Sequence, residues 1–204
     1  MKDNYKEDLK EIRHLMNRSS RFTHVSGISG IAVGILALAA TFIAYIFFAE
    51  VLFYTESPTK GATSNYTWQL ATLGAITLIL AILIVVILTY RETTRKKLRF
   101  WALPTHLLLF HLSVPLAIGG AVSIFLLQQN LPVWLLPTTL LFYGLALLSA
   151  SHYTLPAFKN LGLWQLGLGL LALFFIEWAL VFWAFGFGII HILYGILILR
   201  KSNK

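Results

Sequence analysis

The chain has 204 residues, of which 58% are hydrophobic and only 12% charged, and its net charge is +8. This composition excludes a soluble domain, because too much apolar surface would face water. The absence of cysteine excludes disulfides, thiolate metal sites and a cysteine nucleophile. We therefore expect an all-α polytopic membrane protein with six transmembrane helices in one domain.

The basic residues are strongly divided along the chain. Six Lys and Arg precede the first apolar run, five lie in residues 91–99, one is Lys159 and three end the chain, whereas only Lys60 falls on the opposite side. Cytoplasmic loops of membrane proteins carry an excess of Lys and Arg. The division predicts that both termini are cytoplasmic, and it argues against a nucleic-acid partner.

Three parts follow from this pattern. Residues 1–24 predict a cytoplasmic amphipathic helix on the membrane surface, since Tyr5, Leu9, Ile12 and Met16 share one helical face. Such a helix more often anchors to anionic lipid than docks a partner protein, and the sequence is consistent with both uses. Residues 25–200 predict the six-helix domain, and 201–204 a basic cytoplasmic tail.

The first predicted span, 25–52, carries small residues on one face at alternating spacings of four and three. In lipid, small residues let helix backbones approach closely. We expect this stripe to pack against another span of the chain, with a homodimer seam as the alternative. Its members are Thr23, Gly27, Gly30, Gly34, Ala37, Thr41 and Ala44.

The second predicted span, 68–90, has no feature beyond a small-residue face, and we expect it to be scaffold. The third, 102–127, contains Pro115, which removes the helical partner of the His111 carbonyl. A kink satisfied by a neighbouring helix is the favoured interpretation, ahead of a transporter-like binding site.

The fourth predicted span ends near Ser151, with Tyr143 about halfway along it. The last apolar run, 161–200, would be about 60 Å long as one helix, twice the thickness of a bilayer core, so it must turn. A turn at Gly186–Gly188 suits the residue types but leaves a final span of only about 17 Å. A turn at Glu177–Trp178 gives two spans of 21 residues, 156–176 and 179–199. It is therefore the predicted turn, and it brings Glu177 to the outer interface, on the same side as Glu50.

In this hairpin, residues whose numbers sum to about 355 should face each other. Gln165 would then hydrogen-bond His191, contributing on the order of 1 kcal/mol. The same rule sets Gly169 near Gly186. The small face of the fifth span would consist of Gly162, Gly169 and Ala172, and that of the sixth of Ala184, Gly188 and Gly195, with Gly162 near Leu193 and Gly195.

Four polar side chains on four helices share one predicted depth, about 12–14 Å from the inner helix ends. They are His111, Tyr143, Gln165 and His191. Intramembrane ionisable residues tend to face the bundle interior or a pathway, so we predict a polar layer near the midplane. The layer would either join helices or bind a ligand.

Four stretches of the chain show a resemblance to a known group: SRFTHVSGISG from Ser20, YGLALLSASHYT from Tyr143, LGLWQLGLGLLALFF from Leu161 and FGFGIIHILYGI from Phe185. They resemble uncharacterised bacterial six-span integral membrane proteins. The resemblance implies the bacterial cytoplasmic (inner) membrane but no activity. The chain departs from that pattern around 103–111, where arginine and asparagine would be expected instead of histidines.

No catalytic constellation appears in the sequence, and we do not expect an enzyme. The leading hypothesis is a membrane protein that binds lipid or another membrane protein, or senses the membrane. The second is a small-solute or proton-coupled transporter using His111, Gln165 and His191, with Glu50 and Glu177 at the outer mouth. The third is a b-type haem protein with His111 and His191 as axial ligands; otherwise no cofactor is expected.

Overall fold

The computed structural model describes residues 26–53, 62–95 and 103–202. The predicted amphipathic segment 1–24 and residues 203–204 of the tail lie outside these ranges. Every regular element in the described part is helical, and six helices are long and apolar enough to cross a membrane. The prediction of an all-helical chain with six candidate spans is therefore confirmed.

The first three spans are single helices: α2 (Gly27–Phe53), α3 (Ala62–Arg95) and α4 (Leu103–Gln128). Apolar helices of this length satisfy their backbone groups internally, which the bilayer interior requires. Helix α4 continues through Pro115. It ends where Asn130 adopts φ 55°, with the Leu131 N–H bonded to the Leu126 carbonyl at 3.0 Å. This Schellman-type ending followed by Pro132 stops the helix.

The fourth span begins with η1 (Pro132–Trp134) and continues as α5 (Leu135–Ala150) and η2 (Ser151–Tyr153). The fifth span is α6 (Pro156–Phe174), whose first residue is a proline, as suits a position where the missing N–H would have no helical partner.

The last span is the irregular one. It starts with the 3-10 turn η3 (Ile176–Trp178), continues as α7 (Ala179–Trp183) and the π-helical segment η4 (Ala184–Ile190), and ends as α8 (His191–Ser202). The turn of the last apolar run thus lies at residues 175–178, where span length predicted it. Residues Gly186–Gly188 form part of η4 instead.

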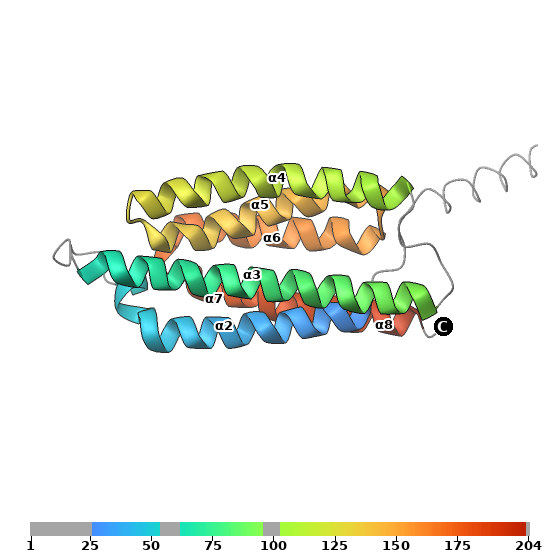
Figure 1. Cartoon of the computed structure of the whole chain (residues 1–204), viewed down its shortest axis with the longest axis horizontal. Coiled ribbons are helices and arrows are strands. Elements are labelled where there is room, and N and C mark those ends of the chain that lie inside the picture. The colour runs from blue at the N-terminus through green and yellow to red at the C-terminus, as the bar shows by residue number, and fades with distance from the viewer. Residues whose placement is uncertain (1–25, 54–61, 96–102, 203–204) are drawn as a thin grey trace, which may run out of the picture.

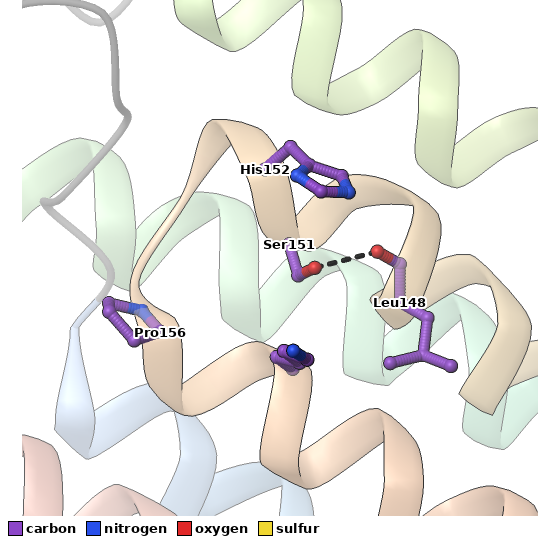
Figure 2. A pocket seen from close by; sticks show the side chains of 5 residues that line it. Leu148, Ser151, His152 and Pro156 are labelled. Carbon is purple, nitrogen blue, oxygen red and sulfur yellow. Dashed lines mark hydrogen bonds between the residues drawn. The ribbon is translucent and has the colours of Figure 1, made fainter. Parts of the chain in front are cut away.

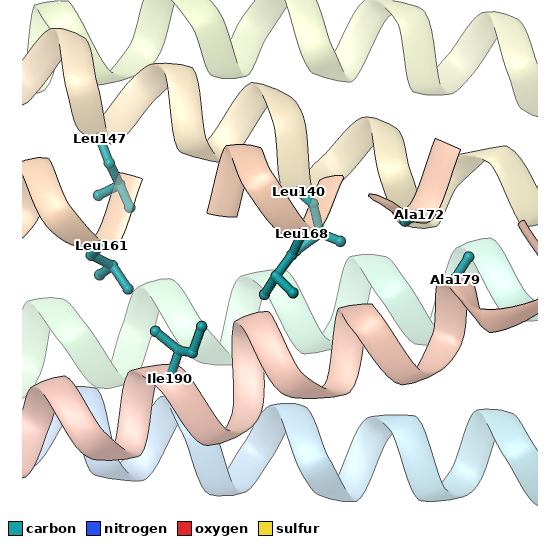
Figure 3. Packing of buried hydrophobic residues seen from close by; sticks show 7 residues of the cluster. All are labelled: Leu140, Leu147, Leu161, Leu168, Ala172, Ala179 and Ile190. Carbon is teal, nitrogen blue, oxygen red and sulfur yellow. The ribbon is translucent and has the colours of Figure 1, made fainter. Parts of the chain in front are cut away.

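The six spans form two layers (Figure 1). One layer contains α4, α5 and α6, in which α5 contacts both α4 and α6; the other contains α3, α2 and the last span, in which α2 contacts both α3 and the last span. The layers meet where α5 and α6 contact the last span. A buried apolar cluster fills this junction (Figure 3), consisting of Leu140, Leu147, Leu161, Leu168, Ala172, Ala179 and Ile190.

Candidate functional site

Polar groups from both layers converge on one backbone carbonyl, that of Gly186 in η4. Gln165 Nε2 of α6 donates to it at 2.8 Å, and His191 Nδ1 of α8 lies 2.9 Å from it. His191 Nε2 in turn lies 2.9 Å from the Tyr143 hydroxyl of α5. We call these four residues the polar cluster.

The geometry fixes where the protons lie in the polar cluster. A carbonyl oxygen only accepts hydrogen bonds, so His191 Nδ1 carries a proton and donates to Gly186. In the neutral imidazole, Nε2 is then an acceptor, and the Tyr143 hydroxyl donates to it. Both ring nitrogens of His191, which is 6% exposed, are therefore hydrogen-bonded within the bundle.

Gln165 is fully buried at 0% exposure. Its amide nitrogen must point to Gly186, because the reverse orientation would set two acceptor oxygens against each other. Its Oε1 atom has no hydrogen-bond partner among the described residues. The polar cluster thus retains one buried acceptor without a hydrogen bond, the Gln165 Oε1 atom. Burying such an acceptor in an apolar interior costs free energy.

Two glycines let η4 approach its neighbours. A Cβ atom at Gly186 would lie 2.7 Å from Gln165 Oε1 and 2.7 Å from a Leu140 methyl carbon, and a Cβ at Gly188 would collide with Leu38 of α2. Aromatic rings pack around this segment, with the Phe187 ring 5.1 Å from that of Tyr143. A π-helical turn inside an α-helix is uncommon and is often found at functional sites.

The predicted contacts within the last hairpin are wrong in detail. Gln165 and His191 do not bond each other; they share the Gly186 carbonyl. A Cβ atom at Gly169 would lie closest to Leu141 of α5.

The glycines predicted to close the inner end of the same hairpin also have other partners. Gly162 lies against Gly144 of α5, and Gly195 against Gly27 of α2, so Gly162 does not meet Leu193 and Gly195. The physical reason is that α6 packs along α5 and α8 packs along α2, whereas the facing rule assumed two straight helices in contact along their full length.

His111 does not join the polar cluster. Its Nδ1 lies 3.2 Å from the Ser149 hydroxyl, and its ring stacks on that of Tyr153 at 4.8 Å between centroids. The equal predicted depth of the four polar side chains therefore does not bring them into one layer. The polar residues divide into the cluster around Gly186 and a separate His111–Ser149 pair.

The small-residue stripe of the first span faces other helices of the same chain. Gly27 and Gly30 contact Gly195, and a Cβ at Gly34 would lie 2.7 Å from the Gly188 carbonyl oxygen. Ala37 and Ala44 of the same face are buried. Thr23 lies outside the described residues. The stripe packs α2 against α8 and η4, which is the intramolecular alternative.

The two acidic residues that were predicted at the outer interface lie at the end of the bundle away from the α5–α6 connection. Glu177 is exposed in the η3 turn, and Glu50 falls near the end of α2. Glu177 does not belong to the polar cluster, and the side chain of Glu50 lies outside the described residues.

Two contacts were not predicted from the sequence. Trp183 Nε1 donates to the Thr139 hydroxyl at 3.1 Å, which adds a second hydrogen bond between two side chains of different layers. The Gly186 carbonyl as a shared acceptor was also missed. The two glycines around Phe187 are the sequence signal for this close backbone approach, although the same residues also suit a turn.

In the described part of the chain, no group of three or more His, Asp or Glu side chains is arranged to hold a metal ion. As haem ligands, His111 and His191 would have to leave separate hydrogen-bonded groups. No protein-family model, curated protein or solved structure matches the chain. The bacterial family resemblance stays a prediction.

Proposed function

We propose that this protein is a non-catalytic integral membrane bundle that binds lipid or another membrane protein, or senses the membrane. The observation that carries the proposal is the outward apolar surface of α3. None of the most apolar 18-residue stretch of this helix is buried. Its exposed large side chains include Ile76, Leu78, Ile79, Ile82, Leu83, Val86 and Ile87. A surface of this kind suits lipid chains or a partner helix.

The polar interior supports the same proposal. The side chains of Tyr143, Gln165 and His191 form hydrogen bonds that join helices. The Trp183–Thr139 pair does the same. Interhelical bonds of this type contribute on the order of 1 kcal/mol each to the stability of membrane bundles. These side chains therefore stabilise the two-layer arrangement, and the outer surface remains for recognition.

We further propose that both termini are cytoplasmic and that the membrane is the bacterial cytoplasmic membrane. The charge distribution supports the orientation. The end of α3, the start of α6 and the end of α8 lie at one end of the bundle, and they carry Arg91 and Arg95, Lys159, and Arg200, respectively. Glu177 lies in the η3 turn, beyond the opposite end of α6. Basic residues favour the cytoplasmic side.

The test is gentle purification followed by native mass spectrometry, with a parallel flux assay in proteoliposomes. The proposal predicts copurifying lipid or protein and no solute or proton flux above that of protein-free vesicles. Solute or proton flux that depends on the protein, with no retained lipid or partner, would contradict this proposal and support the transport hypothesis.

One observation favours transport as the second candidate. The last span is interrupted by η4 near its middle, and the polar cluster there includes the unpartnered Gln165 Oε1. Interrupted helices at the bilayer midplane form the substrate sites of many transporters. This candidate predicts proton-coupled uptake that His191→Leu abolishes, whereas the lipid- or protein-binding bundle predicts no uptake by either form.

A further inference from the structure

The connection between α5 and α6 contains a groove with a volume of about 380 Å³ (Figure 2). Its lining residues are Leu148, Ser151, His152, Pro156 and Lys159. The groove lies where two spans end, so it opens at the level of a membrane surface. Its volume is at the low end of the roughly 300–1,000 Å³ typical of small-ligand sites. It therefore suits a headgroup rather than a whole lipid.

The hydrogen-bond donors of the groove select an anion. Lys159 and His152 are exposed, and no hydrogen bond or ion pair ties either side chain to another described residue. The Ser151 hydroxyl already donates to the Leu148 carbonyl at 2.7 Å (Figure 2). The ammonium of Lys159 and the imidazole of His152 thus supply the side-chain donors available to a ligand.

The position of Lys159 is unusual for a helix. It lies in the first turn of α6, whose N-terminal end carries the partial positive charge of the helix dipole. A cation there is unfavourable for the helix alone, but a bound anion would be attracted by both the dipole and the lysine. Arg91 and Arg95 lie in the last two turns of α3, whose C-terminal end is at the same end of the bundle, and they raise the local positive potential.

The remaining lining residues are apolar. Leu148 and Pro156 line the groove together with the donors (Figure 2). A phospholipid joins a charged phosphodiester to an apolar body, and basic pockets between transmembrane helices at a membrane surface bind such headgroups. An inorganic anion would leave the apolar part of this lining unused.

We propose that this groove binds the phosphodiester headgroup of an anionic phospholipid, with Lys159 as the principal contact and His152 as the second. The inference rests on the proposed function, because it names the lipid class and the place where the bundle holds it.

The experiment is a titration of short-chain phosphatidylglycerol and of phosphatidylcholine onto the full chain in neutral detergent, with bound lipid counted by native mass spectrometry. The protein should prefer phosphatidylglycerol. Lys159→Gln should weaken that binding about fivefold, the effect of one lysine charge near a membrane surface, and Lys159→Arg should preserve it. His152→Glu, which sets a like charge in the groove, should weaken phosphatidylglycerol binding and leave phosphatidylcholine unchanged.

The matched control is Arg200→Gln, which removes one exposed positive charge from the same end of the bundle but outside the groove. It should leave binding unchanged. An equal loss in Arg200→Gln and Lys159→Gln would overturn the site in favour of a diffuse field. Equal melting temperatures would establish that the variants are folded.

Two further outcomes separate the possible ligands and the two proposals. Displacement of phosphatidylglycerol by millimolar inorganic phosphate would overturn the lipid assignment and assign the groove to a free anion. Equal retention of both lipids by every variant would reject the groove but leave the proposed function intact. Failure to retain any lipid or partner, together with flux, would reject both.

Discussion

The Tyr143 hydroxyl lies 2.9 Å from Nε2 of His191, and this hydrogen bond joins the two helix layers. Tyr143 belongs to α5 in one layer, and His191 begins α8 in the other. His191 also donates to Gly186, whose carbonyl accepts from Gln165 of α6. His191 thus connects the last span to α5, and the Gly186 carbonyl connects it to α6.

Removing the Tyr143 hydroxyl tests this connection. Tyr143→Phe should lower the free energy of unfolding by about 0.6 kcal/mol and at most about 1.7 kcal/mol, the range for hydrogen bonds between membrane helices. Unfolding in mixed detergent, in a double-mutant cycle with His191→Leu, should give a coupling of similar size. Tyr194→Phe is the matched control, since Tyr194, in the same helix as His191, makes no hydrogen bond to another described residue. Strict additivity of Tyr143→Phe and His191→Leu would show that the bond contributes nothing.

Gly186 should not tolerate a side chain. The Cβ of Gly186→Ala would lie 2.7 Å from both Gln165 Oε1 and Leu140, so these side chains must shift and the bond from Gln165 weakens. We expect a loss of about 1–3 kcal/mol, as for other overpacked sites. Gly167→Ala is the control, because a Cβ there meets no atom within 4 Å and alanine favours the helix by up to about 1 kcal/mol. Equal thermal stability of the two variants would contradict the polar cluster.

The contact between α2 and α8 can be tested at Gly195. In Gly195→Ala, the new Cβ would lie 2.6 Å from the Gly27 carbonyl oxygen, and a backbone atom cannot turn aside as a side chain can. The helices must separate, and thermal melting should show a larger loss of stability than for Gly186→Ala. Gly74→Ala of α3 meets nothing within 4 Å and should melt like the parent. Normal melting of Gly195→Ala with a change from dimer to monomer would instead support the homodimer seam.

His111 and His191 should behave as independent sites. They share no hydrogen-bond partner among the described residues, so the effects of His111→Leu and His191→Leu on unfolding should add within about 0.5 kcal/mol. Absorption spectroscopy of the purified protein separates this expectation from the haem hypothesis. A Soret band that either substitution abolishes would show that both histidines bind one haem.

Much of the architecture could be predicted from the sequence because it depends on local chemistry. Apolar length identifies the spans, and span length alone distinguishes the turn at 175–178 from the glycines at 186 and 188. The small residues of α2 mark a close helix contact, although the sequence does not say with which helix. Span length and the spacing of small residues along a helix are properties of the sequence itself, and tertiary contacts do not alter them.

The parts that could not be predicted depend on how the helices are arranged. The separation of His111 from the polar cluster follows from the direction in which each helix faces, which depth along the membrane normal does not determine. Likewise, Gly162 and Gly195 have different partners because α6 and α8 belong to different layers. Predicting these contacts requires the order of helices around the bundle.

The π-helical winding of Ala184–Ile190 makes this segment the part of the last span that can best lose a residue. A π-helical turn accommodates additional backbone without altering the faces of the helix before and after it. Deleting one residue from this segment, other than Gly186 or Gly188, should therefore restore ordinary α-helical winding while α7 and α8 keep the faces that they turn to the bundle. The same deletion in α6 would rotate every following side chain by about 100° around the helix. We therefore expect the last span to tolerate the loss of one residue in this segment better than in α7 or α8.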